Sequence, residues 1–413
     1  MTKVAFVSFR LKALDGVSVE AEKWISVFEQ WGCEVHRVAG QIPGAGERDH
    51  IITELNFLDP QVESFTLKSF DPGQDRDGID NEYALLEAEI EQHLVPVLDK
   101  IAPEIAIVEN VFSLPLNLPF TMVLCRYLQE ENIPCIAVHH DFYWQDPKLG
   151  KCLFEELLSS HFPPSLPRIR HVTINERTRE ELYRRTGVSA TRIRNCFDFD
   201  EPRERDGFNS GMRDELGMNG EDVMFLQPTR AIERKGIGLS IKFVEEYAAA
   251  SGKTARLVVT GPCEQGYEQK FGRLCRNSRA QVLHIPNWLG SCRNHPGAIS
   301  SYDVRDAYAV CDMVTFPSSR EGFGNPVLES VVQRKPLLVA DYPVLEELRE
   351  YGFQFLPLDD RAVDRAVKMM EYPQLMEEMA DRNFEIGRKH FSLDNLREEL
   401  TELVASAALP ALD

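Results

Sequence analysis

The sequence predicts an α/β protein with two domains, each built from a parallel sheet covered by helices. Short apolar runs alternate with amphipathic helical patterns along the chain, as in proteins made of βαβ units. The chain has 413 residues, more than one hydrophobic core usually spans. A second alternating series begins near Val223, after a polar, glycine-containing and charged segment at 198–219. We interpret this segment as the interdomain linker.

The first domain is expected to open with a strand at 4–7, followed by a loop and a helix. Ser18 is expected to cap this helix, and Gly32 to end it. Another helix is expected at 83–101, because apolar residues recur there on one helical face. That face holds Leu86, Ile90, Leu94 and Val97.

The remaining strands are expected at short, continuous apolar runs, which are typical of buried strands in a parallel sheet. In the first domain these runs are 105–108, 135–138 and 171–174. In the second domain they are 223–226, 257–260, 282–284, 313–316 and 337–340.

Composition argues against several classes of protein. An apolar content of 43% with 27% charged residues is typical of a globular protein. No run approaches the roughly 20 apolar residues that span a bilayer, and no cleavable signal pattern precedes the first strand, so we expect a cytoplasmic protein. The net charge of −20 argues against nonspecific nucleic-acid binding. The nine cysteines form no C-x-x-C pair, which indicates reduced thiols.

The sequence offers no ligand cluster with the spacing of a metal site, so we expect no metal. The acidic loop at 71–78 lacks the ligand register and the terminal glutamate of a calcium loop. Asp198 and Asp200 form a D-x-D pair, but they fall in the expected linker, which disfavours a metal role.

The segment 318–329 carries the strongest functional signal in the chain. A buried strand precedes it, and a helix is expected to follow, with Asn325 as N-cap and Pro326 as first residue. Gly322 and Gly324 would let the loop backbone approach a phosphate or a sugar closely. Because a helix N-terminus presents unpaired N–H groups, this arrangement predicts an anion site.

Two carboxylates bracket the predicted anion site, Glu321 in the loop and Glu329 about one turn into the helix. Carboxylates would repel a bare phosphate, but they suit a ligand that also carries hydroxyl groups. A nucleotide-sugar is such a ligand. The alternative interpretation is an ordinary strand–loop–helix unit with two solvated glutamates.

The two glutamates around Gly-Phe-Gly resemble the E-x7-E motif of retaining glycosyltransferases of the GT-B fold, specifically family 4. The resemblance covers nearly the whole chain and is most specific at 225–341. It implies two Rossmann-like domains facing a cleft, with the donor held mainly by the second. We expect domains at 1–198 and 199–392, and a C-terminal helix at 393–413 that returns to the first domain.

The resemblance also implies roles for the motif. Glu329 would accept hydrogen bonds from the ribose hydroxyls, and Glu321 would contact the transferred sugar. The backbone of Gly322, Phe323, Gly324 and Asn325 would hold sugar and phosphate. Members of the family retain the anomeric configuration, need no metal and no other cofactor, and are thought to react on the front face of the donor sugar.

A basic loop follows the first strand of the second domain. Arg230 and Lys235 could reach a pyrophosphate together and neutralise the charge that builds on the departing diphosphate. This pair, followed by Gly236, resembles the Arg-x4-Lys pair of family 4; the alternative is a merely solvated loop. Gly261, which follows the strand expected at 257–260, is also assigned to the substrate site, because ligands bind at such strand ends.

In the first domain, the strand at 135–138 runs directly into His139, His140 and Asp141. A histidine at a strand end could hydrogen-bond a sugar hydroxyl or touch the reaction centre, and His140 fits the family position better than His139. The alternative is a histidine that satisfies loop carbonyl groups. Gly16 lies in a loop that resembles the glycine-containing first loop of the family, which approaches the donor phosphate and the acceptor, although many relatives have two glycines there. We assign both Gly16 and Asp141 to the substrate-binding residues.

Eight arginines lie between residues 168 and 194. They could attract an anionic acceptor or an acidic membrane surface. A solvated helix with ion pairs to Glu176, Glu180 and Glu181 is the favoured interpretation.

The expected function is transfer of a hexose from a nucleoside-diphosphate sugar to a hydroxyl group of a small molecule or a glycan. A sugar phosphorylase or a nucleotide-sugar epimerase on the same fold, and a noncatalytic nucleotide-sugar-binding protein, remain alternatives. The sequence specifies neither the base, nor the sugar, nor the acceptor. It leaves the oligomeric state and any peripheral membrane contact open.

Overall fold

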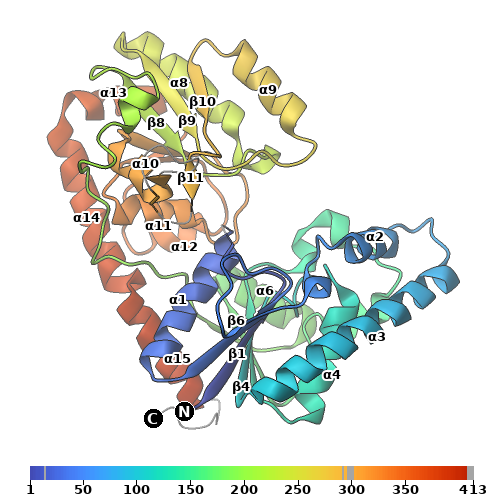
Figure 1. Ribbon diagram of the computed structural model, residues 1–413. Helices are drawn as coiled ribbons and strands as arrows, with labels where there is room; N and C mark the ends of the chain where they lie inside the picture. The colour runs from blue at the N-terminus through green and yellow to red at the C-terminus, as the bar shows by residue number, and fades with distance from the viewer. Residues whose placement is uncertain (14, 291–292, 295–301, 407–413) are drawn as a thin grey trace. The chain divides into compact units, whose positions relative to one another are not determined.

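The computed structural model describes residues 1–13, 15–290, 293–294 and 302–406. The chain divides into two compact units. Unit 1 contains Met1–Asn195 together with the chain from Leu396 onward, and unit 2 contains Cys196–Asn395 (Figure 1).

Unit 1 is built on a parallel sheet. Its order in the described residues is β3-β2-β1-β4-β5-β6-β7. The strands are β1 (Lys3–Ser8), β2 (Glu34–Ala39), β3 (Asp49–Ile51), β4 (Ile105–Glu109), β5 (Cys135–His139), β6 (Ile169–Thr173) and β7 (Ala190–Arg192). The chain order reverses between β1 and β4, and the carboxyl ends of strands at such a point are where ligands bind in open α/β sheets.

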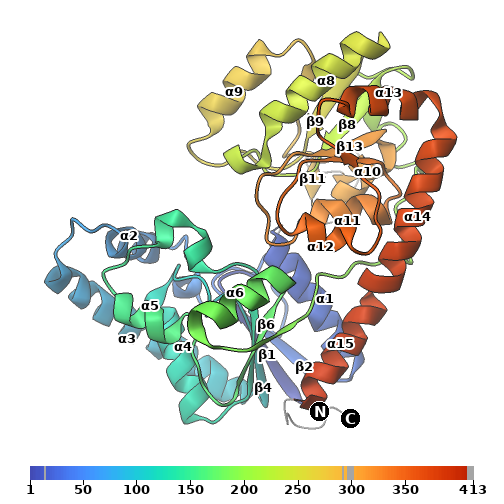
Figure 2. The ribbon, with the colours of Figure 1, turned by 180° about the vertical axis from the view of Figure 1, so that it is seen from behind.

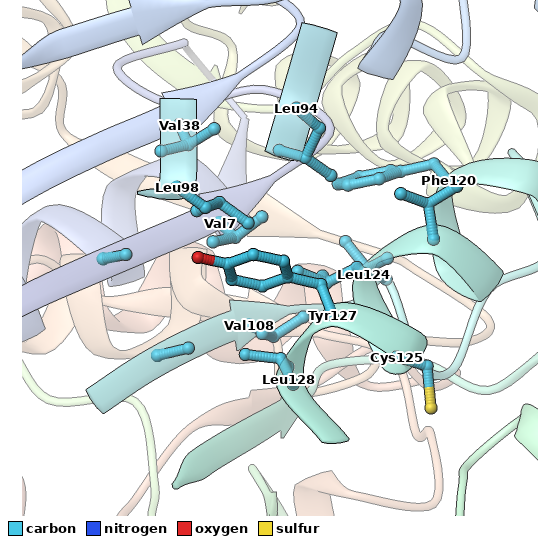
Figure 3. Close-up of a cluster of buried hydrophobic side chains, with 14 of the residues drawn as sticks. Val7, Val38, Leu94, Leu98, Val108, Phe120, Leu124, Cys125, Tyr127 and Leu128 are labelled. Carbon is cyan, nitrogen blue, oxygen red and sulfur yellow. The ribbon is translucent and has the colours of Figure 1, made fainter. Parts of the chain in front are cut away.

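Helices cover the sheet of unit 1 on both faces. Helices α3 (Arg76–Ile101) and α4 (Leu118–Glu130) lie side by side (Figures 1 and 2). Their side chains pack with one face of the strands in a continuous core; Leu94, Phe120 and Tyr127 meet Val7 and Val108 (Figure 3).

Helix α1 (Gly16–Gln30) covers the other face of this sheet, where Phe28 meets Phe6 edge to face at 5.7 Å. Because successive residues of a strand point to opposite faces, Phe6 and Val7 serve the two layers in turn. Helices α2 (Pro60–Ser69), α5 (Glu155–His161) and α6 (Glu176–Thr186) also belong to unit 1.

Unit 2 is built on a second parallel sheet, with the order β10-β9-β8-β13-β14-β15 in its described part. Its strands are β8 (Val223–Gln227), β9 (Ala255–Val259), β10 (Gln281–His284), β13 (Met313–Phe316), β14 (Leu337–Val339) and β15 (Leu356–Pro357). A small additional pair consists of β11 (Leu289–Gly290) and β12 (Tyr302–Asp303). The order reverses between β8 and β13, so this edge is also a candidate ligand site.

Helices α8 (Ile237–Ser251), α9 (Glu268–Asn277) and α13 (Ala362–Glu371) share one core with β8 and β9, centred on Phe225, Phe243 and Tyr247. Helix α11 (Asn325–Val332) packs against α14 (Pro373–Phe391). The remaining helices are α7 (Met212–Glu215), α10 (Val304–Val310) and α12 (Leu345–Arg349).

The strands expected from continuous apolar runs are confirmed, with ends that shift by one or two residues. At 171–174 and 257–260 the strands begin two residues earlier than expected. The helix expected at 83–101 begins at Arg76, and Leu98 rather than Val97 is fully buried with Leu94.

Two expectations about local structure outside the glycine loop are wrong. Asp15 rather than Ser18 caps α1, and its carboxylate accepts hydrogen bonds from the Ser18 amide at 3.0 Å and the Ser18 hydroxyl at 3.2 Å. The segment 198–219 is part of unit 2 rather than a free linker, because Phe199 and Met212 are buried and Arg213 pairs with Asp312 at 3.0 Å.

The last helix, α15 (Leu393–Ser406), belongs to unit 1 from Leu396 onward. Arg397 donates to Gln30 at 2.7 Å, and Arg194 pairs with Glu399 at 2.8 Å. A stripe of buried leucines, at spacings of one helical turn, includes Leu396 and Leu400. Residues 407–413 of the expected C-terminal segment lie outside the described residues.

None of the helices in the described part of the chain combines the length and the hydropathy that a membrane-spanning segment needs.

Replacing Leu400 by alanine should destabilise unit 1 by about 2–5 kcal/mol, because its side chain is fully buried. Hydrogen exchange of the folded protein tests this: the amides of β1 and β4 should lose protection, whereas those of β8 and β13 should keep it. Glu402→Ala, at an exposed position of the same helix, is the control. Equal loss of protection in both units, or none, would contradict the assignment of α15 to unit 1.

Candidate functional site

The site in unit 2 begins with the loop after β8. Gln227, the last residue of β8, donates from its side-chain amide to the carbonyl oxygen of Lys235 at 2.9 Å. Gly236 has φ +64°, and a Cβ there would lie 2.3 Å from the carbonyl oxygen of Pro317. Only glycine permits this close approach. The loop is therefore pressed against the segment that follows β13, which carries Glu321.

The approach of the two loops creates a buried ionic cluster. Lys235 Nζ lies 2.6 Å from Glu321 Oε1, and Arg234 lies 3.1 Å from Glu321 Oε2. The hydroxyl of Ser318 donates to the same carboxylate. The Glu321 side chain is only 8% exposed, so it depends on these partners for charge compensation.

The electrostatics of the cluster favour an ionised carboxylate. Burial raises the pKa of Glu321, but the charges of Lys235 and Arg234 outweigh it and hold the pKa below its usual value. Burial lowers the pKa of Lys235; the charge of Glu321 opposes this effect, and the charges of Arg234 and Arg230 add to it. A second anion brought to this point would help to compensate the excess of cations.

Arg230 lies at the surface rather than in the buried cluster. Its side chain is more than half exposed and makes a loose pair with Glu264 at 3.8 Å. Gly261 supports its backbone: a Cβ on Gly261 would lie 2.5 Å from the amide nitrogen of Arg230. The structure thus gives Gly261 a packing role at the ends of β8 and β9, and it keeps Arg230 accessible.

The glycine loop after β13 differs in detail from its expected form. Helix α11 begins at Asn325, so Gly324 is the cap residue and Pro326 the second helical residue. The expectation that Asn325 caps the helix is therefore wrong. Gly324 has φ +96°, and a Cβ there would lie 2.2 Å from the hydroxyl oxygen of Tyr342. This hydroxyl donates to the Phe323 carbonyl at 3.2 Å.

The side chain of Phe323 is turned into the interior. It is buried, and its ring centroid lies 6.3 Å from that of Phe391. A ligand at the glycine loop could therefore meet the backbone of Phe323 but not its ring. Gly322 and Asn325, by contrast, are partly exposed.

Glu329 lies on α11, about one turn after its start, and is partly exposed. The hydroxyl of Tyr308 in α10 donates to Glu329 Oε2 at 2.7 Å. Burial, with the adjacent Glu329 charge, raises the pKa of Tyr308 well above its usual value, so this hydroxyl remains a donor. Tyr308 thus fixes one oxygen of the Glu329 carboxylate.

In unit 1, the two neighbouring histidines have different environments. His139 is buried at the end of β5, where Nε2 lies 2.9 Å from Nδ1 of His171. Burial lowers its pKa well below the usual value, which marks a neutral packing residue. His140 follows the strand, and its Nε2 lies 2.9 Å from Glu109 Oε2. It is paired with a carboxylate rather than with loop carbonyl groups.

Gly16 and Asp141 are both exposed. Gly16 is the first residue of α1, immediately after its cap. Asp141 follows His140 at the carboxyl end of β5, and its negative charge contributes to raising the pKa of His140. Both therefore lie where the parallel sheet of unit 1 would receive a ligand.

The described residues contain no group of three or more His, Cys, Asp and Glu side chains placed to hold a metal ion. In the D-x-D pair, the amide of Asp200 donates to Asp198 Oδ1 at 2.9 Å, which is a local turn. The acidic loop ends where Asp75 caps α3.

The arginine-rich stretch contains the expected ion pairs. Arg185 pairs with Glu181 at 2.8 Å, and Arg179 pairs with Glu176. These pairs on α6 favour the interpretation of a solvated helix.

Four residues of these two sites were not identified from the sequence: Arg234, Ser318, Tyr308 and Glu109. A weak signal existed for Arg234, because it adjoins Lys235 in the basic loop, and for Glu109, because it ends an apolar strand run. Tyr308 gave no signal, since its partner Glu329 lies on another helix.

Comparison with known proteins identifies the chain. Residues 210–389 match the family model described as glycosyl transferases group 1. The mannosylglucosylglycerate synthase of Thermotoga maritima is 30% identical over 97% of this chain and 99% of the relative. An enzyme of the same name from Petrotoga mobilis is 28% identical over 87% of each chain.

Solved structures agree on the fold. HepE of Anabaena, determined in complex with UDP and glucose, covers 98% of this chain and 100% of its own, with a TM-score of 0.65 and 15% identity. At that identity the likeness shows the architecture alone, two Rossmann-like domains of the GT-B type. Together with the full-length relative, it shows that this chain is a glycosyltransferase that belongs to the group 1 family, family 4 of the GT-B enzymes.

Proposed function

We propose that this enzyme transfers a mannosyl group from a nucleoside-diphosphate sugar to the glucosyl hydroxyl of a glucosylglycerate acceptor, with retention of configuration and without a metal or other cofactor. The choice of sugar and acceptor is supported by the two mannosylglucosylglycerate synthases, which align with most of the chain. The observation that carries the chemistry is the buried Lys235–Glu321 pair beside the glycine loop.

The diphosphate of the donor fits the cationic side of this cluster. Lys235 and Arg234 together face one carboxylate, and Arg230 adds a further accessible charge. The N-terminus of α11 contributes a partial positive charge at the glycine loop. Fixed positive charges at this place would stabilise the negative charge that grows on the leaving diphosphate.

The two glutamates would bind different parts of the donor. Glu329 is held by Tyr308 and partly exposed, which suits a rigid acceptor for the ribose hydroxyls. Glu321 lies deeper, beside Lys235, and would contact the transferred sugar. In unit 1, His140 would donate a hydrogen bond to a hydroxyl group of the reacting sugars.

The proposed reaction proceeds on the front face of the donor sugar. The bond between the anomeric carbon and the diphosphate oxygen breaks, and a bond to the acceptor oxygen forms on the same face. The acceptor's proton passes to the leaving diphosphate. Because the cations of unit 2 compensate the charge on this group, the step needs no metal ion.

An assay with GDP-mannose and UDP-mannose, each with and without glucosylglycerate, tests the proposal. We expect nucleoside diphosphate to be released only when the acceptor is present. From an α-linked donor, NMR should show an α-linked mannosyl product. A β-linked product would overturn retention. A free sugar phosphate or an epimerised donor would point to a phosphorylase or an epimerase instead.

Arg230→Ala should lower kcat about 10²–10³-fold, the typical loss for one donor to a transition-state charge. The melting temperature should stay nearly unchanged, because the side chain is exposed and weakly paired. Steady-state kinetics and thermal denaturation measure the two effects. Glu264→Gln, which removes the partner of Arg230 but no cation, is the control and should keep its rate. Normal kinetics of Arg230→Ala would exclude Arg230 from the donor site.

Lys235→Ala should lower both turnover and stability, in contrast to Arg230→Ala. Removing one partner of a buried pair typically costs about 3–5 kcal/mol, because the other charge stays buried. The double variant Lys235→Ala/Glu321→Gln should recover part of this stability but none of the activity. Chemical denaturation and initial rates of both variants test this. Recovery of turnover in the double variant would show that Lys235 only balances Glu321.

Glu329→Gln and Glu321→Gln should separate donor binding from turnover. Glu329→Gln should weaken the binding of free nucleoside diphosphate by about 1.5–3 kcal/mol, because it loses a hydrogen bond to a charged acceptor. Glu321→Gln should bind nucleoside diphosphate almost normally but turn over slowly. Calorimetry and initial rates provide the comparison. The reverse pattern would show that the assignment of the two glutamates is wrong.

Activity should survive EDTA, since Lys235, Arg234 and Arg230 supply the charge compensation that a metal would otherwise provide. Initial rates before and after chelation measure this. Loss of activity that Mg²⁺ or Mn²⁺ restores would contradict a metal-independent reaction.

A further inference from the structure

A second buried ionic cluster lies in unit 1, at the carboxyl ends of its strands. Glu109 is the last residue of β4, and His140 directly follows β5. Both are almost completely buried, with relative exposures of 1% and 6%. On α1, Glu20 is buried as well and pairs with Lys23 at 2.5 Å.

Glu109 and the neighbouring backbone fix the position of His140. The imidazole Nε2 lies 2.9 Å from Glu109 Oε2. The amide of His140 donates to Asn110 Oδ1 at 2.8 Å. The ring is thus held at one nitrogen and at its backbone, while Nδ1 has no hydrogen-bond partner in the described part of the chain.

Stability alone gives no reason for such a cluster. The desolvation of a buried ion pair typically offsets its attraction, so well-packed apolar side chains would stabilise these positions at least as well. The same bond, however, decides the chemistry of the histidine. When Nε2 carries a proton and donates it to Glu109, Nδ1 is the second ring nitrogen. If the ring takes up a second proton, that proton lies on Nδ1, which then becomes a hydrogen-bond donor.

We propose that Glu109 is a positioning residue of the transferase reaction: it orients His140 and keeps it as an imidazolium, so that Nδ1–H donates to a hydroxyl or phosphate oxygen of the reacting sugars. His140 then acts as a hydrogen-bond donor and not as a general base. This inference rests on the function proposed above, in which His140 contacts the reacting sugars.

The surroundings of His140 favour the charged ring. Burial lowers its pKa, but the hydrogen bond and charge of Glu109, with the charges of Glu20 and Asp141, outweigh this and raise the pKa above its usual value. The charged and titratable groups around the ring are Glu109 on β4, Glu20 and Lys23 on α1, and His139 and Asp141 beside it in the chain.

The sign of the pH effect follows from this arrangement. A protonated His140 is lost as the pH rises through its pKa, so activity should fall on the alkaline side. Glu109→Gln removes the charge that holds the proton but keeps an oxygen that can accept the hydrogen bond. The alkaline fall should therefore move to lower pH by about one to three units, the usual effect of one adjacent opposite charge.

The first measurement is an NMR titration of the full-length protein with labelled histidine, in which His140→Asn identifies the His140 signal. In the wild-type protein His140 should titrate above the usual histidine range, and in Glu109→Gln it should titrate lower. Glu54→Gln is the matched control, because it changes another histidine–glutamate pair, with His93 at 3.1 Å. It should leave the His140 titration unchanged.

The second measurement is kcat/KM against pH for the same proteins, with thermal denaturation to confirm folding. The kcat/KM of Glu109→Gln should approach the wild-type value at low pH and fall about tenfold or more below it at the alkaline end. The kcat/KM of Glu54→Gln should follow the wild type at every pH. In a protein that already carries His140→Asn, adding Glu109→Gln should not shift the pH profile of kcat/KM further. A purely structural role of Glu109 would instead lower the rate equally at every pH.

The outcomes separate this inference from the function on which it rests. A His140 that titrates normally in the wild-type protein, or an unshifted profile in an active Glu109→Gln, overturns the inference alone. A wild-type protein that releases no diphosphate from any mannosyl donor with acceptor overturns the proposed function and the inference with it.

Discussion

The buried ion pair between Lys235 and Glu321 is the constraint on which the site of unit 2 depends. It joins the loop after β8 to the loop after β13, at the point where the strand order reverses. Next to Lys235, Gly236 lets one loop pass close against the Pro317 carbonyl of the other. A carboxylate buried to this extent needs a cation, so neither residue can change without affecting the other. The charge that fixes the loops is also the charge that would meet the donor diphosphate.

Unit 1 shows the same physical arrangement with different residues. His140 and Glu109 form a buried pair at the carboxyl ends of neighbouring strands, again next to the reversal of strand order. In both units a basic side chain is held by a carboxylate that is less exposed than its partner. Each such pair restricts the conformations of a side chain that would contact a substrate. Preorganised charges of this kind are a main source of transition-state stabilisation. The Tyr308–Glu329 bond extends the principle to a carboxylate that would bind hydroxyl groups.

Features that depend on neighbouring residues in the sequence could be predicted, whereas features that depend on contacts between distant segments could not. The buried strands and the glycine loop appear as continuous patterns, so the α/β class and the motif at 318–329 could be predicted. Short edge strands such as β3 and β15 have only three and two residues, too few to show a strand pattern, and they were missed. The cap of α11 was misplaced because a glycine with positive φ took the position expected for Asn325. Arg234 and Ser318 could not be linked to Glu321, since only the contact between two loops brings them together.

A crystal structure with a bound nucleoside diphosphate tests the central claim most directly. The account predicts that the β-phosphate lies within hydrogen-bond distance of Lys235 Nζ or the Arg230 guanidinium, with the ribose hydroxyls on Glu329 and the glycine-loop backbone against the phosphates. Lys235 should either keep its contact with Glu321 or replace it by a contact with the phosphate. The backbone of the loop around Gly236 should stay in place in both cases. A diphosphate bound away from Lys235, Arg230 and the glycine loop would contradict the account.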